Sequence, residues 1–248
     1  MESVDARRAP PFWRHDGYTL DCLQKGIREA ISVARLQANI GIAPASVVDI
    51  GAGSAPYRAL FEELGAKYVT CDMEGGNANH DSSLPDVKIV PGQTIDIESK
   101  SANWVVSFQV LEHVWDLDWY LGECRRILKD DGVLILSTHG TWLYHPHPTD
   151  YRRWTRDGLR EEILSRGFDI VSVVPIVGPL AWTTQFRSLA YHHVLSRLPV
   201  VGKMLSALVC TFMNMRMKIE DRITPQVQIE ANAAVYIVLA TVRRSAES

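Results

Sequence analysis

Residues 46–56 read Ser-Val-Val-Asp-Ile-Gly-Ala-Gly-Ser-Ala-Pro. The apolar run at 46–50 predicts a buried strand, and Gly51 and Gly53 predict a tight turn whose backbone can pass close to a ligand. The segment 56–64 predicts a helix, with Pro56 in its first turn and Gly65 after its end. A strand that leads through a glycine turn into a helix exposes free backbone amides, which is typical of nucleotide sites.

Two features narrow the kind of nucleotide. A dinucleotide fingerprint needs a third glycine where Pro56 stands, which disfavours an NAD-dependent oxidoreductase. A second predicted strand, 68–71, leads into Asp72, which follows Asp49 by 23 residues. A carboxylate at that place can accept hydrogen bonds from both ribose hydroxyls. The pattern therefore favours a nucleoside cofactor without pyrophosphate.

Predicted strands and helices alternate along the rest of the chain. The helix 17–40 ends at Gly41, and Asp130-Asp131-Gly132 predicts a turn. Near-continuous apolar strands between helices indicate a parallel sheet that is covered on both faces. The other strands are predicted at 87–90, 104–108, 133–137, 168–174 and 233–241, and the other helices at 117–128, which Asp116 caps, and at 155–166.

One segment departs from this alternation. Residues 180–219 are helical and apolar, and we interpret them as an insertion that forms a lid or a docking surface. Within it, residues 195–218 combine apolar and basic side chains, which suits contact with a membrane surface, a homodimer contact or buried core. The predicted division is an N-terminal helical segment or lid at 1–44, a cofactor domain at 45–175 plus 231–243, and a helical insertion at 176–230.

Composition limits the function classes. The chain has 248 residues, 46% of them hydrophobic, and a formal net charge of −3, so it lacks the basic excess of a nucleic-acid-binding protein. Its four cysteines form no CxxC pair, and we expect reduced thiols. Residues 1–8 are charged with no apolar stretch behind them, and no apolar run is long enough for a spanning helix. We expect a cytoplasmic protein, with peripheral contact at the inner membrane face as an option.

Three motifs in order carry a resemblance to a known family. Residues 49–53, Asp-Ile-Gly-Ala-Gly, resemble motif I of class I S-adenosylmethionine (SAM)-dependent methyltransferases. Residues 107–114, Ser-Phe-Gln-Val-Leu-Glu-His-Val, resemble the signature of the ubiquinone-biosynthesis-type subgroup, and Asp131-Gly132-Val133-Leu134 resembles the start of its fifth strand. The resemblance covers about residues 45–174 and implies an α/β, Rossmann-like, mostly parallel seven-stranded sheet, with helices on both faces and a helical insertion before the last strand.

The resemblance also implies a cofactor, SAM, and the residues that hold it. Asp49 and the backbone of the glycine turn would hold the amino-acid part of SAM, Asp72 the ribose, and Met73 the adenine. Gln93 stands where the family usually has an acidic residue at the adenine amine. The full predicted set is Asp49, Gly51, Ala52, Gly53, Asp72, Met73, Gln93, Phe108 and Gln109.

The predicted acceptor site is the loop at 138–154, which follows the fifth strand and is rich in His, Tyr and Trp. Ligands of open α/β sheets bind at that edge. His145, His147 and Asp150 are candidate bases or acceptor contacts, unless they only brace the loop. A metal site that includes His139 is an alternative, but successive side chains of His-Pro-His-Pro point in different directions, and we predict no metal. Residues 145–155 also resemble a stretch of methyltransferases from bacterial saccharide-biosynthesis clusters.

His113, just after the fourth strand, is a further candidate base for the acceptor proton, or it orients the loop through a hydrogen bond. We predict methyl transfer from SAM to a hydroxyl of a saccharide or glycoside. The alternatives are a small aromatic or quinone-like hydroxyl, and a SAM-binding partner subunit without catalysis. Expected partners are a sugar or other small hydroxyl acceptor and no nucleic acid.

Overall fold

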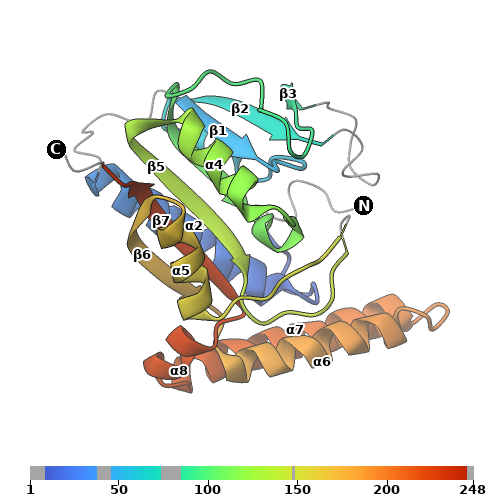
Figure 1. Cartoon of the computed structure of the whole chain (residues 1–248). Coiled ribbons are helices and arrows are strands. Elements are labelled where there is room, and N and C mark those ends of the chain that lie inside the picture. The colour runs from blue at the N-terminus through green and yellow to red at the C-terminus, as the bar shows by residue number, and fades with distance from the viewer. Residues whose placement is uncertain (1–8, 38–45, 74–84, 147–148, 245–248) are drawn as a thin grey trace.

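A seven-stranded sheet forms the centre of the computed structural model (Figure 1). The structure describes residues 9–37, 46–73, 85–146 and 149–244. The strand order is β3-β2-β1-β4-β5-β7-β6, and only β7 runs antiparallel to its neighbours. The strands are β1 (Ser46–Ile50), β2 (Lys67–Asp72), β3 (Val87–Lys88), β4 (Ala102–Phe108), β5 (Leu128–His139), β6 (Phe168–Ile176) and β7 (Val235–Val242). The predicted mostly parallel, Rossmann-like sheet is confirmed.

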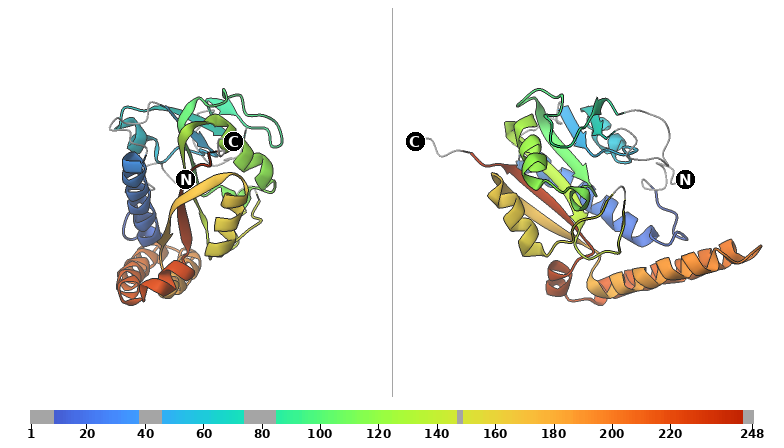
Figure 2. Two further views of the ribbon diagram at one scale, coloured as in Figure 1. Left: turned by 60° about the vertical axis from the view of Figure 1, so that its left-hand side comes forward. Right: turned by 45° about the vertical axis from the view of Figure 1, so that its right-hand side comes forward.

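Helices cover both faces of this sheet (Figure 2). They are α2 (Gly17–Gln37), α3 (Arg58–Glu62), the 3₁₀ turn η1 (Leu111–His113), α4 (Leu117–Ile127), α5 (Arg156–Ser165), α6 (Pro179–Leu195), α7 (Gly202–Ile223) and α8 (Gln226–Ala231). Successive strand residues point to opposite faces, so the buried Trp104 and Val106 join one core and Val105 the other. The first core packs on α2 and α3, and the second on α4 and α5.

Local sequence signals account for several helix ends. The carboxylate of Asp116 accepts a hydrogen bond from the Trp119 amide at the start of α4, as predicted. The hydroxyl of Thr155 accepts one from the Gly158 amide at the start of α5. Gly167, after α5, has φ = +82°, the left-handed conformation that glycine adopts readily.

Two local predictions need correction. The turn predicted at 130–132 lies within β5, because Leu128 pairs with Ala102 and Val133 with Trp104, and the extra residues between them form an irregularity in the strand. The helix predicted at 56–64 is shorter, since α3 begins at Arg58 after a residue with positive φ, Ala55. The predicted end of the first helix near Gly41 lies outside the described residues, and α2 extends to Gln37.

The predicted helical insertion is present between β6 and β7. Helices α6 and α7 lie side by side as a long hairpin that extends beyond the sheet (Figures 1 and 2). Partly buried polar contacts hold its base: the Tyr18 hydroxyl and the Gly178 amide both donate to the carboxylate of Asp221. The side-chain amide of Asn214 donates to the carbonyl oxygens of Phe12 and Arg14. The hairpin is therefore fixed to the body at one end.

Candidate functional site

The order of the strands reverses between β1 and β4, which is where open α/β sheets form a ligand crevice. At the end of β1, Gly51 and Gly53 have φ values of +77° and +55°. The amides of Gly51 and Ala52 donate to the Cys71 carbonyl oxygen at 2.8 and 3.2 Å, which fixes the turn against β2. A Cβ atom on Gly51 would lie 2.6 Å from a methyl of Val110, so glycine is required there by packing as well as by φ.

Asp72 lies at the end of β2 beside this turn, as predicted. Its carboxylate accepts hydrogen bonds from the amides of Gly53 (2.6 Å) and Met73 (2.7 Å). Burial raises the pKa of Asp72, and the two amides oppose that rise. The glycine turn and the Asp72 carboxylate, which the sequence assigned to the ribose, are therefore hydrogen-bonded to each other.

Asp49 is a second, fully buried carboxylate in the crevice. The Tyr68 hydroxyl donates to it at 2.5 Å. Burial, assisted by the charge of Asp72, raises the pKa of Asp49 to about 7, although the hydrogen bond from Tyr68 opposes the rise. This carboxyl group thus exchanges its proton near neutral pH.

The end of β4 supplies the other wall of the crevice. Gln109 adopts the left-handed conformation with φ = +58°, an uncommon state for a residue other than glycine that is associated with functional sites. Its amide donates to the Ser137 carbonyl oxygen, and its side-chain nitrogen to the Ser137 hydroxyl. Phe108 is buried edge-on against Tyr57, 4.9 Å between ring centroids. Gln93 is exposed, and its carbonyl oxygen accepts from the Trp119 indole at 2.9 Å.

These residues fit a cationic nucleoside. Two carboxylates, Asp49 and Asp72, flank a glycine turn, and they would repel a pyrophosphate but attract the sulfonium and ammonium charges of SAM. Asp72 can exchange its bonds to backbone amides for bonds to ribose hydroxyls. The chemistry of the donor set therefore agrees with the predicted cofactor.

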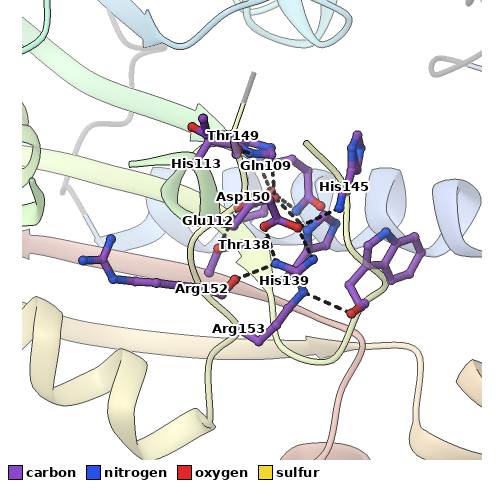
Figure 3. Close-up of polar contacts among 12 residues, drawn as sticks. Gln109, Glu112, His113, Thr138, His139, His145, Thr149, Asp150, Arg152 and Arg153 are labelled. Atoms are coloured by element: carbon purple, nitrogen blue, oxygen red, sulfur yellow. Dashed lines mark hydrogen bonds and ion pairs between the residues drawn. The ribbon is translucent and has the colours of Figure 1, made fainter. Parts of the chain in front are cut away.

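A second cluster lies at the same edge and centres on Glu112, whose side chain is fully buried (Figure 3). Its carboxylate accepts from the Thr138 hydroxyl at 2.8 Å and lies 2.9 Å from Nδ1 of His139 and 4.0 Å from Nε2 of His113. Burial alone would raise the pKa of Glu112, but the His139 imidazole outweighs it and lowers that pKa. An ionised carboxylate thus faces two imidazoles.

His113 and His139 face this carboxylate, and a third histidine, His145, lies against both of their rings. The rings of His113 and His145 meet edge-on with centroids 5.8 Å apart, and those of His139 and His145 are 6.0 Å apart. The His139 ring stacks on Trp142 at 4.9 Å with an interplanar angle of 1°. Nδ1 of His113 contacts the carbonyl oxygen of Thr149. The structure therefore brings His113 and His145 together as candidate bases.

The environment of Asp150 does not suit a general base. The Arg153 guanidinium donates two hydrogen bonds to it, at 2.5 and 2.6 Å, and the His145 amide donates a third at 2.7 Å. Although burial would raise the pKa of Asp150, these bonds lower it to about 2. Arg153 also donates to the carbonyl oxygens of Trp142 and Leu143. The pair holds the acceptor loop in shape, and such a carboxylate is a weak proton acceptor.

The segment after Asp150 joins two loops. The Tyr151 amide donates to the Glu112 carbonyl oxygen, and the Arg152 guanidinium to the carbonyl oxygens of Val114 and Trp115. The backbone amide of the buried Trp154 donates a hydrogen bond to the carbonyl oxygen of His139. The motif at 145–155 thus fastens the loop after β5 to the loop after β4.

His147 lies outside the described residues. Within the described ranges, the His, Cys, Asp and Glu side chains form no group of three that could hold a metal ion. A cavity of about 1140 Å³ lies at the opposite edge of the sheet, beside Arg126 and Arg166. These arginines already pair with Glu123 and Glu162, and the cavity is far from the glycine turn.

Sequence reasoning assigned no role to Glu112 and considered His139 only as a metal ligand. Glu112 belongs to the quoted motif at 107–114, and a carboxylate next to His113 in sequence is a usable signal. His139 is buried at the end of β5, where an apolar residue would be expected. A histidine that replaces a core residue at a ligand-binding edge is the signal that points to it.

The fold and the crevice define a class I nucleoside-binding α/β protein. A family model described as a methyltransferase domain matches residues 23–173. The chain belongs to this methyltransferase family, and the predicted cofactor, SAM, is confirmed by that membership.

Individual relatives agree with the family. The chain is 26% identical over 133 residues to a probable SAM-dependent methyltransferase of Mycolicibacterium smegmatis. The aligned segment covers 50% of this chain and 52% of that protein. It is 26% identical over 181 residues to a ubiquinone biosynthesis O-methyltransferase of Cereibacter sphaeroides, with 60% and 71% covered. The chain spans about half the length of the mycobacterial relatives that it matches.

Solved structures share the fold. A SAM-dependent methyltransferase from Archaeoglobus fulgidus superposes with a TM-score of 0.51 at 14% identity, over 88% of this chain and 93% of that one. An N1-methyltransferase from Burkholderia thailandensis, solved with S-adenosylhomocysteine, has a TM-score of 0.50 at 15% identity, over 88% and 78%. At these identities the likeness concerns the fold alone.

Proposed function

We propose that the protein transfers the methyl group of SAM to a hydroxyl of a saccharide or glycoside. The observation that carries the proposal is the buried Glu112 carboxylate with His113 and His139 beside it and His145 against both rings, at the edge where β1 and β4 end. A sugar hydroxyl is a poor nucleophile at neutral pH, and a group that accepts its proton is worth about 10²–10⁴-fold in rate. Bound SAM supplies an electrophilic methyl group on a sulfonium.

His113 is the preferred base. A carbonyl oxygen can only accept, so the contact of His113 Nδ1 with Thr149 requires the proton on Nδ1. Nε2 then carries the lone pair that can take up the acceptor proton. Glu112, 4.0 Å from Nε2, would stabilise the imidazolium that forms.

Aromatic rings beside the cluster suit the flat, apolar face of a sugar ring. Trp142 stacks on His139, while Trp115 and Tyr151 lie 5.3 Å apart and are exposed by 71% and 45%. The resemblance of residues 145–155 to saccharide-cluster methyltransferases supports the same acceptor class.

A small aromatic or quinone-like hydroxyl is the second candidate. The similarity to ubiquinone biosynthesis O-methyltransferases favours it. A SAM-binding subunit without catalysis is the third, and the buried Glu112 among histidines argues against it, because a scaffold gains nothing from burying an ionised carboxylate.

An assay with methyl-labelled SAM tests the proposal. The protein is incubated with nucleotide sugars and alkyl glycosides in one panel and with catechols and hydroquinones in another, and mass spectrometry detects methyl ethers. Methylation in the first panel supports the saccharide reading. Methylation in the second panel alone establishes the aromatic acceptor, and retention of bound SAM with no product in either contradicts catalysis on these classes.

Alanine variants then separate the roles of the histidines. His113→Ala should lower kcat about 10²-fold with SAM affinity unchanged, because a lost base acts on the chemical step. His145→Ala should mainly raise KM for the acceptor. Near-normal kcat in both variants would leave His139 or positioning alone to carry the reaction.

A further inference from the structure

Helix α7 has an inverted distribution of side chains. Its buried positions are small or polar except for Met217, and its outward face is apolar. The buried positions are Gly202, Ser206, Cys210, Asn214, Met217 and Glu220. The outward stripe is Met204, Leu208, Phe212, Met215 and Ile219, each between 55% and 63% exposed. A helix of a water-soluble protein normally shows the reverse, whereas small residues between helices and large apolar ones outside are typical of helices in apolar surroundings.

Helix α6 and the tip of the hairpin continue this pattern. The buried positions of α6 are Ala181, Thr184, Gln185 and Ser188. Val194, in its last turn, is 64% exposed, and Val200, at the tip, is fully exposed. Between the helices, a shallow apolar groove of about 470 Å³ is lined by side chains that include Leu205, Leu208 and Phe212. An apolar surface this continuous marks an interaction site.

The charges of the hairpin have one sign as far as Ile219, and its acidic residues, Glu220 and Asp221, lie in the last turn of α7. The sequence from Ile170 to Ile219 contains no Asp or Glu, although the whole chain has a formal net charge of −3. Its basic residues are Arg187, Arg197, Lys203, Arg216 and Lys218. Arg197 and Lys203, on either side of the tip, are exposed beside the outward valines. Towards its tip the surface therefore combines apolar and basic side chains, which is the composition that binds anionic lipid interfaces.

We propose that the α6–α7 hairpin docks on the surface of an anionic phospholipid bilayer. The apolar stripe enters the boundary between headgroups and acyl chains, and the basic side chains extend to lipid phosphates. A two-fold contact between copies of the chain is disfavoured, because each partner would present the same basic residues, and the acids of α7 are already engaged: Glu220 pairs with Arg216, and Asp221 accepts from Tyr18 and Gly178. Among the described helices, none has the length and apolarity to cross a bilayer, so the hairpin lies on the surface.

The position of the hairpin relates the membrane to the crevice. Strand β6 runs parallel to β5, so α6 starts at the edge of the sheet that carries the histidine cluster. The hairpin projects on that side (Figure 2). Docking would bring the opening of the crevice towards the lipid surface, whatever the acceptor is.

Flotation of the full chain with vesicles tests the proposal. Vesicles of phosphatidylglycerol and phosphatidylcholine should carry the protein upward in a density gradient, with binding that weakens as salt rises, and vesicles of phosphatidylcholine alone should bind much less. The double variant Arg197→Gln/Lys203→Gln should bind about 30-fold more weakly, since each basic residue contributes about fivefold. Lys67→Gln/Arg244→Gln, which removes two exposed charges elsewhere, is the matched control and should bind normally.

The apolar stripe has its own pair of variants. Leu208→Ser/Phe212→Ser should abolish flotation, while Leu36→Ser, at a residue that is 80% exposed on α2, should not. Unchanged melting temperatures show that both variants fold. Wild-type protein that fails to float with anionic vesicles at low salt overturns the proposal. If light scattering then finds a dimer that the Leu208→Ser/Phe212→Ser variant loses, a second copy covers the face.

Discussion

At the scale of single residues, the two carboxylates of the crevice have different environments. Asp72 is half-buried and bonded to two backbone amides, whereas Asp49 is fully buried under the Tyr68 hydroxyl. That Asp72 and Asp49 bind the cofactor is a prediction, and each carboxylate leads to a different test.

Asp72→Ala should weaken SAM binding by about 1.5–3 kcal/mol, the range for hydrogen bonds to a charged group. Calorimetric titration with SAM measures it. Because Asp72 also holds the Gly53 amide, Asp72→Asn is the control: it keeps an acceptor oxygen and should lose less affinity. Equal affinity in all three proteins would remove Asp72 from the ribose site.

Asp49 should make SAM binding depend on pH. Its pKa is about 7 in the free protein, and the positive charge of SAM favours the ionised carboxylate. The Kd should therefore fall about tenfold from pH 6 to pH 8 as the ionised fraction rises. Binding at pH 7 should release protons, which calorimetry in buffers of different ionisation enthalpy detects.

The stability of the free protein should respond in the opposite direction. The folded state binds the Asp49 proton more tightly than the unfolded state, whose pKa is about 3.9, so this group lowers the free energy of unfolding as pH rises from about 4 to about 7. The Asp49→Asn variant should lose both pH dependences. A SAM affinity that is the same at pH 6 and pH 8 in the wild type would contradict the assignment.

At the scale of elements, the acceptor loop depends on the pair Asp150–Arg153. Arg153→Ala removes two bonds to the carboxylate and three to backbone carbonyls, and should lower the free energy of unfolding by about 2 kcal/mol. It should raise KM for the acceptor and leave SAM affinity unchanged, because the cofactor residues lie on other strands. Denaturant titration and steady-state kinetics measure these effects. Arg160→Ala on α5 is the control, and a similar loss there would show that the effect is not local.

The strand–turn–helix unit was predictable because its requirements are local. Gly51 and Gly53 adopt the positive φ values that their sequence suggested, and Asp116 caps α4 through its own side chain. The strand boundaries were less predictable. Residues 130–132 read as a turn, yet they lie in β5, because pairing with β4 is a tertiary contact that local composition does not report.

At the scale of the whole molecule, methyl transfer from SAM needs no metal, because the sulfonium already makes its methyl group reactive. We expect full activity after treatment with EDTA, measured with the labelled-SAM assay. Loss of activity that a divalent ion restores would make the histidine loop a metal site, with His147 as a candidate ligand.

The sequence alone determined the class of the protein. Glycine turns, helix caps and alternating apolar strands act over a few residues, and three ordered motifs sufficed to predict the sheet, the cofactor and the residues Asp49 and Asp72 that would hold it. Only the tertiary structure decided which distant side chains meet. Glu112 and His139 come from separate strand ends 27 residues apart, and Asp150 pairs with Arg153 instead of standing free as a base. The outward apolar face of α7 likewise became visible only when packing showed which side of the helix is buried, because burial is a property of packing and not of composition.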